Sequence, residues 1–161
     1  MRIAILGNSG SGKSTLARRL AREARAPHLD LDTIVWEPQK IAIAREKARV
    51  LADLRAFCEA SESWVVEGCY ADVIEACLVY HPRLLLLNPG VDVCLEHARS
   101  RPWEPHKLQS KEKQDELLAF QLTWIADYPS REGPMGLAAH RGLFHAYTGE
   151  KRELVDRDSY A

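Results

Sequence analysis

The sequence has no excess of charge of either sign, and this narrows the classes of protein it can belong to. Its 22 Lys and Arg against 23 Asp and Glu give a formal net charge of −1. A non-specific nucleic-acid binder usually carries a basic excess. No apolar stretch approaches the roughly 18 residues that a membrane span needs, and no secretory signal is recognisable. We therefore expect a cytoplasmic protein with no membrane or nucleic-acid partner.

Paired cysteines are also missing. The four cysteines include no CxxC pair, so neither a zinc site nor a disulfide scaffold is indicated. We find no internal repeat and no low-complexity linker. A chain of 161 residues with 46% hydrophobic residues is long enough for one core. We expect residues 1–161 to form a single domain.

Short apolar runs alternate with longer amphipathic segments along the chain. The runs predict strands at 2–6, 28–31, 64–66, 84–87 and 151–155. The amphipathic segments predict helices at 16–26, 43–60, 91–100, 110–128 and 135–147. Strands that alternate with helices indicate βαβ units. We therefore expect an α/β fold with a mostly parallel sheet of about five strands and helices on both faces.

Residues 7–14 read GNSGSGKS and match the pattern G-x-x-x-x-G-K-[ST] between a predicted strand and a predicted helix. Glycines let backbone N–H groups approach phosphates closely, and the helix N-terminus adds the positive end of its dipole. We expect Lys13 to reach the β- and γ-phosphates of ATP, and the Ser14 hydroxyl to bind Mg²⁺. The predicted nucleotide-binding residues are Gly7, Asn8, Ser9, Gly10, Ser11, Gly12, Lys13, Ser14 and Thr15, the last at the α-phosphate.

Three carboxylates follow predicted strands, at the sheet edge where parallel sheets bind ligands. Asp30 and Asp32 are two residues apart, so on an extended chain their side chains point the same way. We assign Asp30 to the shell of Mg²⁺, which prefers oxygen ligands, and Asp32 to the acceptor as general base or orienting group. The alternative is a cap or turn after the strand. Glu67 is a Walker-B-like acid at the magnesium site or, with Gly68, a contact to the acceptor, and a cap or turn is the alternative for Glu67 too.

These residues resemble those of small kinases. The spacing from Lys13 to Asp30 and Asp32 is similar to that of shikimate kinases, in which a D-x-D pair ends the second strand. In that family the first Asp is associated with magnesium and the second with the substrate hydroxyl. The E-G after the third predicted strand resembles the D-G of the adenylate-kinase group.

The whole combination, GxSGSGKST…HLDxDxxxW…WVVEGxY, is most similar to bacterial P-loop proteins labelled adenylate-kinase-like or topology-modulation proteins. The resemblance covers about the first 90 residues. It implies a three-layer P-loop NTPase fold with a lid, and phosphotransferase activity with ATP and Mg²⁺ as cofactors.

Two departures limit what the resemblance implies about the acceptor. Shikimate kinases carry a run of glycines after the third strand, where this chain reads EGCY. Adenylate kinases follow D-G with a Pro-Arg that helps bind the acceptor phosphate, and here Tyr70 and Ala71 hold those places. Neither shikimate nor AMP is therefore supported as the acceptor, and a near-neutral chain gives no support to a role in DNA topology.

Two variable regions are expected to complete the site. Residues 99–115 are basic and contain two prolines, as expected of a lid that brings positive charge to the phosphates. Arg99 and Arg101 are the candidate phosphate contacts, with an ordinary charged surface as the alternative. In the resembled families, the region corresponding to 33–63 covers the acceptor. Trp36 either walls that pocket or packs in the core. Arg45, Arg49 or Arg55 could neutralise an acidic acceptor, and the alternative for each is a solvated helix face.

Together these observations predict an ATP- and Mg²⁺-dependent phosphotransferase that moves the γ-phosphate to a small-molecule hydroxyl or phosphate acceptor. The predicted catalytic residues are Lys13, Asp32, Arg99 and Arg101, and the predicted acceptor contacts are Asp32, Trp36, Glu67 and Gly68. Two alternatives stay open. One is a nucleoside or nucleotide kinase, and the other is a regulatory P-loop NTPase with slow hydrolysis and a protein partner.

Overall fold

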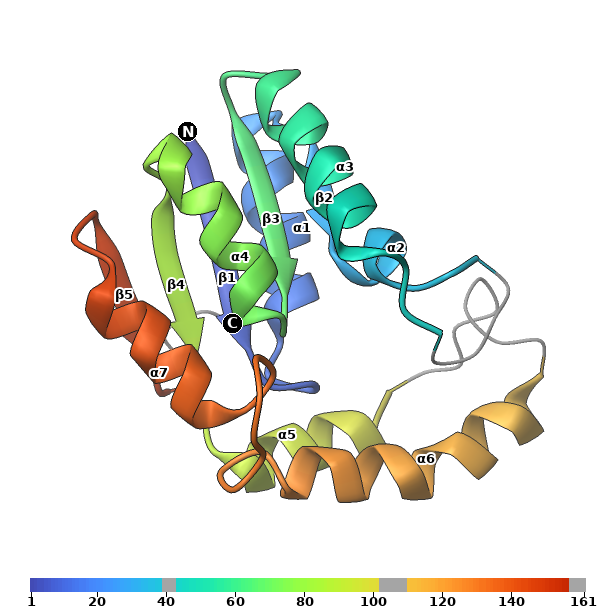
Figure 1. Cartoon of the computed structure of the whole chain (residues 1–161). Helices are drawn as coiled ribbons and strands as arrows, with labels where there is room; N and C mark the ends of the chain where they lie inside the picture. The colour runs from blue at the N-terminus through green and yellow to red at the C-terminus, as the bar shows by residue number, and fades with distance from the viewer. Residues whose placement is uncertain (39–42, 102–109, 157–161) are drawn as a thin grey trace.

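Five strands form one parallel sheet in the order β2-β3-β1-β4-β5 (Figure 1). The structure is a computed structural model that describes residues 1–38, 43–101 and 110–156. The strands are β1 (Arg2–Gly7), β2 (His28–Asp30), β3 (Trp64–Gly68), β4 (Arg83–Leu87) and β5 (Lys151–Leu154). All five predicted strands are confirmed, including the one at the sheet edge.

The register of the sheet brings the carboxyl ends of three strands together. Glu67 of β3 lies opposite Ile5 of β1 on one side and opposite Asp30 of β2 on the other. The loop that follows β1 therefore begins beside the ends of β2 and β3. Because ligands of open parallel sheets bind beyond the carboxyl ends of the strands, this register fixes where a site can form.

Helices cover both faces of the sheet, as predicted. The helix α1 (Lys13–Ala24) packs on one face, where Leu16, Ala17 and Ala21 meet inward-facing residues of the strands. The opposite face carries α3 (Lys47–Glu59), α4 (Ala71–Cys77) and α7 (Leu137–Ala146). A sheet covered on both faces needs apolar strands throughout, and this explains the run of leucines in β4.

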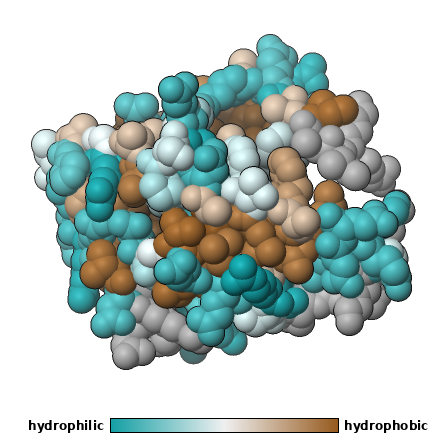
Figure 2. All heavy atoms as spheres, turned by 90° about the horizontal axis from the view of Figure 1, so that it is seen from below, coloured by the Kyte–Doolittle hydropathy of each residue, from teal (hydrophilic) through white to brown (hydrophobic). Residues whose placement is uncertain are grey.

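The helices α5 (Val91–Arg99) and α6 (Lys111–Ala126) lie beyond the carboxyl ends of the strands. They share a small separate core made of Cys94, Ala98 and Ile125. Seen from this end, the molecule carries a central area of apolar side chains bordered by hydrophilic ones (Figure 2). Within the described ranges, every helix is too short or too polar to cross a membrane.

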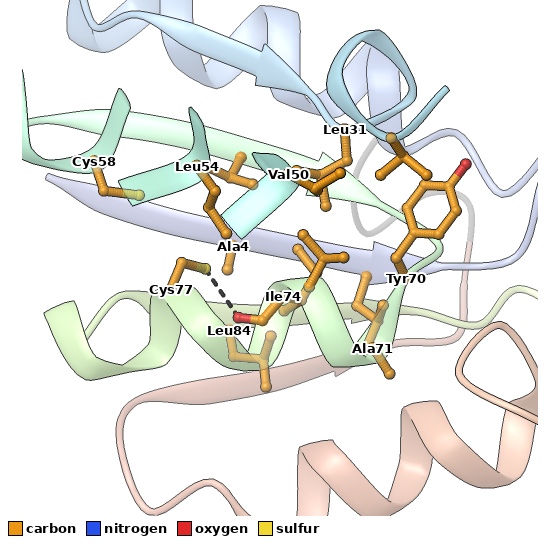
Figure 3. Packing of buried hydrophobic residues seen from close by; sticks show 14 of the residues in the cluster. Ala4, Leu31, Val50, Leu54, Cys58, Tyr70, Ala71, Ile74, Cys77 and Leu84 are labelled. Atoms are coloured by element: carbon orange, nitrogen blue, oxygen red, sulfur yellow. Dashed lines mark hydrogen bonds between the residues drawn. The ribbon is translucent and has the colours of Figure 1, made fainter. Parts of the chain in front are cut away.

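The larger core lies between the sheet and the α3–α4 side (Figure 3). There Val50 and Leu54 of α3 and Ile74 of α4 point toward Ala4 and Leu84 of the central strands. All five are nearly inaccessible to solvent. This packing fixes the helices α3 and α4 against the central strands β1 and β4.

Three elements were not predicted, and one helix begins later than expected. The short helices α2 (Asp32–Val35) and α4, and the 3₁₀ turn η1 (Leu78–Tyr80), are too short for a clear helical period. The helix predicted at 43–60 begins at Lys47 because Ala44 instead pairs with Trp36 in an antiparallel bridge.

Candidate functional site

The loop between β1 and α1 adopts a backbone that glycine makes possible. Gly10 has φ of +77°, in the left-handed region. A Cβ atom there would lie 2.4 Å from the carbonyl oxygen of Cys94 in α5, so no larger residue fits. Gly12, also at positive φ, caps α1. The unpaired N–H groups of the first turn of α1 therefore face the loop, as an anion-binding site requires.

The predicted phosphate-contacting side chain is held at this loop. Lys13 is only 8% exposed, and its Nζ donates a 2.8 Å hydrogen bond to the carbonyl oxygen of Asn8. Ser14 lies half-buried behind it, whereas Thr15 is exposed in the first turn of α1. The structure thus brings Lys13 and the glycine turn together. The individual phosphate contacts of the loop residues stay predictions.

Both helices beyond the strand ends bind the loop directly. The Asn8 Nδ2 donates to the carbonyl oxygen of Ile125 in α6 at 3.1 Å, while its Oδ1 accepts from the backbone N–H of Ser9 at 2.9 Å. His97 of α5 places its Nδ1 2.8 Å from the carbonyl oxygen of Gly10. The loop conformation is therefore set by α5 and α6 as well as by its own glycines.

A buried carboxylate lies next to the loop. Glu67, at the end of β3, is 2% exposed. Burial raises the pKa of its carboxyl group, while the charge of Lys13 and a hydrogen bond from the Ser14 hydroxyl oppose this rise. Its Oε1 has no hydrogen-bond partner among the described residues, and the nearest imidazole nitrogen, Nε2 of His28, is 3.9 Å away. A buried acceptor oxygen left unpaired is unusual and indicates a missing ligand or water.

The aspartate pair is arranged differently from the expectation of one extended segment. β2 ends at Asp30, and Asp32 begins α2. The Oδ1 of Asp30 accepts a hydrogen bond from the backbone N–H of Asp32 at 3.0 Å, so Asp30 forms the turn that starts this helix. The negative charges of both aspartates nonetheless contribute to the raised pKa of Glu67. All three carboxylates therefore lie in one electrostatic neighbourhood with Lys13, and their roles toward metal and acceptor stay predictions.

Gly68 and Trp36 have structural surroundings of their own. A Cβ atom at Gly68 would lie 2.8 Å from Cδ1 of Leu31, so this glycine lets the turn before α2 pack closely against β3. Trp36 is half-buried and packs against the larger core. Core packing is thus confirmed for Trp36, and its contact with an acceptor, like that of Gly68, stays a prediction.

One residue near the acids was missed by sequence reasoning. Tyr70 is 5% exposed, and its hydroxyl donates a 2.6 Å hydrogen bond to Oδ1 of Asp32. The indole Nε1–H of Trp36 donates to the same hydroxyl at 2.8 Å. No spacing pattern signals this arrangement, because it links three segments through side chains alone. In the sequence, Tyr70 stands out only as a departure from the Pro-Arg of adenylate kinases.

The predicted arginine contacts divide into three cases. Arg45 donates to the carbonyl oxygen of Ile34 at 2.9 Å and pairs with Asp53 of α3 at 2.8 Å, and its contact with an acceptor stays a prediction. Arg99 is exposed at the end of α5. Arg101 is half-buried at the last described position before residues 102–109. Residues 102–109 of the predicted lid (99–115) lie outside the described residues, and the roles of Arg99 and Arg101 stay predictions.

A buried histidine supports the segment after β3. His140 of α7 is inaccessible to solvent; its Nδ1 lies 2.8 Å from the Tyr128 hydroxyl and its Nε2 lies 2.9 Å from the carbonyl oxygen of Cys69. Burial, together with the charges of Lys13 and Arg131, lowers the pKa of His140 to about 4, although the hydrogen bond to the carbonyl oxygen of Cys69 acts to raise it. The neutral ring therefore accepts from Tyr128 and donates to Cys69. This locks α7 against the chain that carries Tyr70.

Comparisons with known proteins bear on the fold. No protein-family model and no curated protein matches the chain. The chain is similar to the crystal structure of a gluconokinase from Sinorhizobium meliloti 1021, at 19% identity over 98% of this chain and 85% of that one, with a TM-score of 0.50. A shikimate kinase from Bacteroides thetaiotaomicron matches at 23% identity over 79% of this chain and 78% of that one, with a TM-score of 0.45.

At these identities the likeness concerns the fold alone. The parallel sheet with helices on both faces is the three-layer α/β fold of P-loop kinases, as predicted from the sequence. The narrower resemblance to topology-modulation proteins is not confirmed.

Proposed function

We propose that this protein is an ATP- and Mg²⁺-dependent phosphotransferase that moves the γ-phosphate of ATP to a small-molecule hydroxyl or phosphate acceptor. One observation carries the proposal. The glycine turn holds a buried lysine, Lys13, and the strand beside β1 ends in a buried acid, Glu67, whose Oε1 has no hydrogen-bond partner among the described residues. A structural glycine turn needs neither a buried lysine nor a buried acid beside it.

The residues at this edge fit a magnesium ion carried by ATP. Hard oxygen ligands are available from the Ser14 hydroxyl and the carboxylates of Glu67 and Asp30, and the unpaired Oε1 of Glu67 suits a metal-bound water. No three His, Cys, Asp or Glu side chains of the described ranges form a complete metal site. Mg²⁺ in kinases relies largely on phosphate and water ligands, so few protein ligands are needed. Bound there, the ion would neutralise charge on the phosphates.

The side chains of the chain itself would supply positioning and charge stabilisation. The backbone N–H groups of the turn and Lys13 would hold the triphosphate and balance the charge that spreads over the transferred group. Asp32 would orient the acceptor and accept its proton. Little covalent chemistry is needed, because holding two reactants in line supplies most of the rate enhancement.

The proposal is tested with γ-radiolabelled ATP against hydroxy acids, sugars, nucleosides and nucleoside monophosphates. We expect label to move to one acceptor class in the presence of Mg²⁺. Lys13→Ala should abolish transfer, and Arg22→Ala is the matched control, because it removes a positive charge from the exposed end of the same helix. Release of phosphate with every acceptor unlabelled, or full transfer by Lys13→Ala, would contradict the proposal.

A further inference from the structure

We infer that Tyr70 is a positioning residue, which holds the Asp32 carboxylate in the one orientation that leaves its second oxygen available to an acceptor hydroxyl. This inference rests on the proposed function, in which Asp32 faces the acceptor. It assigns a role to a residue that touches neither nucleotide nor acceptor in the proposal. The argument depends on the direction of two hydrogen bonds and on the burial of the groups that make them.

The chemistry of the donors fixes the direction of the bonds. An indole N–H can only donate, so the 2.8 Å contact from Trp36 Nε1 makes the Tyr70 oxygen an acceptor. The single hydroxyl proton of Tyr70 is then directed to Oδ1 of Asp32, 2.6 Å away. That distance is typical of a hydroxyl bound to a carboxylate, which is stronger than a bond between neutral groups. The Trp36 contact thus prevents Tyr70 from turning its proton elsewhere.

The two ends of this bond differ in burial. Asp32 is exposed and begins a helix of only four residues. Tyr70 is buried beside the larger core, with its ring 6.2 Å from that of Trp36 in an edge-to-face arrangement. In Figure 3 its ring lies at the border of the core residues and its hydroxyl points outward. The buried side chain of Tyr70 therefore orients the exposed side chain of Asp32.

The backbone around Tyr70 is fixed from two further sides. The N–H of Ala71 donates to the carbonyl oxygen of Pro134 at 3.0 Å, and His140 contacts the carbonyl oxygen of Cys69. On the other side, the bridge between Trp36 and Ala44 anchors the indole that directs the hydroxyl. The position of the Tyr70 oxygen is therefore set by the fold and does not depend on a ligand.

One consequence concerns the class of acceptor. With Oδ1 occupied by Tyr70, Asp32 presents Oδ2, an oxygen that accepts hydrogen bonds and repels anions. A hydroxyl group can donate to that oxygen, whereas a phosphate dianion cannot. Within the proposed function, this geometry favours a hydroxyl acceptor over a phosphate acceptor.

The test removes only the hydroxyl that makes the bond. Tyr70→Phe keeps the buried ring, and we expect kcat for transfer to fall by about 10- to 100-fold, as a misplaced reactive group does, with KM for MgATP unchanged. Tyr80→Phe is the matched control. It also removes a tyrosine hydroxyl bound to a carboxylate, Oε1 of Glu59 at 2.9 Å, at a distant position. A loss no greater than that of Tyr80→Phe would overturn the inference.

A double-mutant cycle distinguishes positioning from a general effect on packing. Because Tyr70 acts through Asp32, adding Tyr70→Phe to Asp32→Asn should reduce kcat no further than Asp32→Asn alone. Additive losses would mean that Tyr70 acts independently, which the inference excludes.

A third measurement needs no acceptor and separates this inference from the proposed function. In protein labelled with carbon-13 aspartate, the Asp32 carboxyl resonance should move in Tyr70→Phe and stay in place in Tyr80→Phe. If the screen finds no acceptor but this resonance moves, the proposed function fails and the positioning stands. If it stays in place, the positioning itself is wrong.

Discussion

Acidification should destabilise the protein through His140, a residue inside the fold. Its ring is inaccessible to solvent and satisfied in the neutral form, accepting from Tyr128 and donating to the carbonyl oxygen of Cys69. A second proton would take the place of the Tyr128 hydrogen bond and place a charge in an apolar surrounding. Burial accordingly lowers the pKa of His140 from its usual 6.5 to about 4.

The size and sign of the effect follow from this shift. Between about pH 6.5 and pH 4, the unfolded chain binds a proton at this position and the folded protein does not. The free energy of unfolding therefore falls as the pH falls through that interval, and this residue adds nothing further above or below it. At about 1.4 kcal/mol per tenfold change in proton affinity, the total loss from His140 is about 3 kcal/mol.

Urea unfolding at several pH values measures this loss. His140→Gln removes the titrating group, so the difference between it and the original protein should shrink as the pH falls. His145→Gln is the control, because it changes an exposed histidine of the same helix. If the stabilities of the original protein and His140→Gln decline in parallel from pH 7 to pH 4, the assignment of acid sensitivity to His140 is refuted.

Three further variants give testable outcomes. Gly10→Ala should destabilise the protein more than Gly90→Ala in urea unfolding: both positions have positive φ, a strain of about 1–3 kcal/mol, but only the new methyl at Gly10 would meet the carbonyl oxygen of Cys94. Equal losses would mean that the close approach has no effect. Glu67→Gln should make the nucleotide-free protein more stable at pH 8, because the raised pKa of Glu67 means that its ionised form is disfavoured in the fold, and stability falls as the pH rises through that pKa. The same variant should need more Mg²⁺ for turnover, and an unchanged Mg²⁺ requirement would remove Glu67 from the metal site. Lys13→Ala should lose binding of a fluorescent ATP analogue in titrations; retained affinity would contradict its place at the phosphates.

Much of the sheet could be predicted because β1, β3 and β4 are short apolar runs. β1 and β4 are buried on both faces, and such strands leave an unbroken hydrophobic signal in the sequence. The edge strand β5 was also predicted, at 151–155, although its sequence KREL is mostly polar. The seven-residue α4 was missed, because so short a segment does not establish a helical period.

The part of the candidate site formed by backbone groups, the glycine turn, could be predicted from the sequence. The spacing of glycines around Lys13 is a local pattern, and the fold places this loop where the pattern requires. The turn at Asp30 shows the opposite case, because one hydrogen bond to the N–H of Asp32 ends the strand earlier than its apolar pattern suggests. The contact between Tyr70 and Asp32 joins residues 38 positions apart, and no property of either residue type points to the other.

The contacts that α5 and α6 make with the glycine turn mean that the conformation of the turn depends on more than its own sequence. The carbonyl oxygen of Gly10 contacts His97 of α5, and the side-chain amide of Asn8 donates to the carbonyl oxygen of Ile125 in α6. Both partners lie far along the chain from residues 7–14. Grafting residues 7–15 onto another strand–helix pair would transfer the sequence motif without the contacts from α5 and α6 that support its conformation. An insertion or deletion in α5 or α6, although distant in sequence, would displace these contacts and change the conformation of the glycine turn.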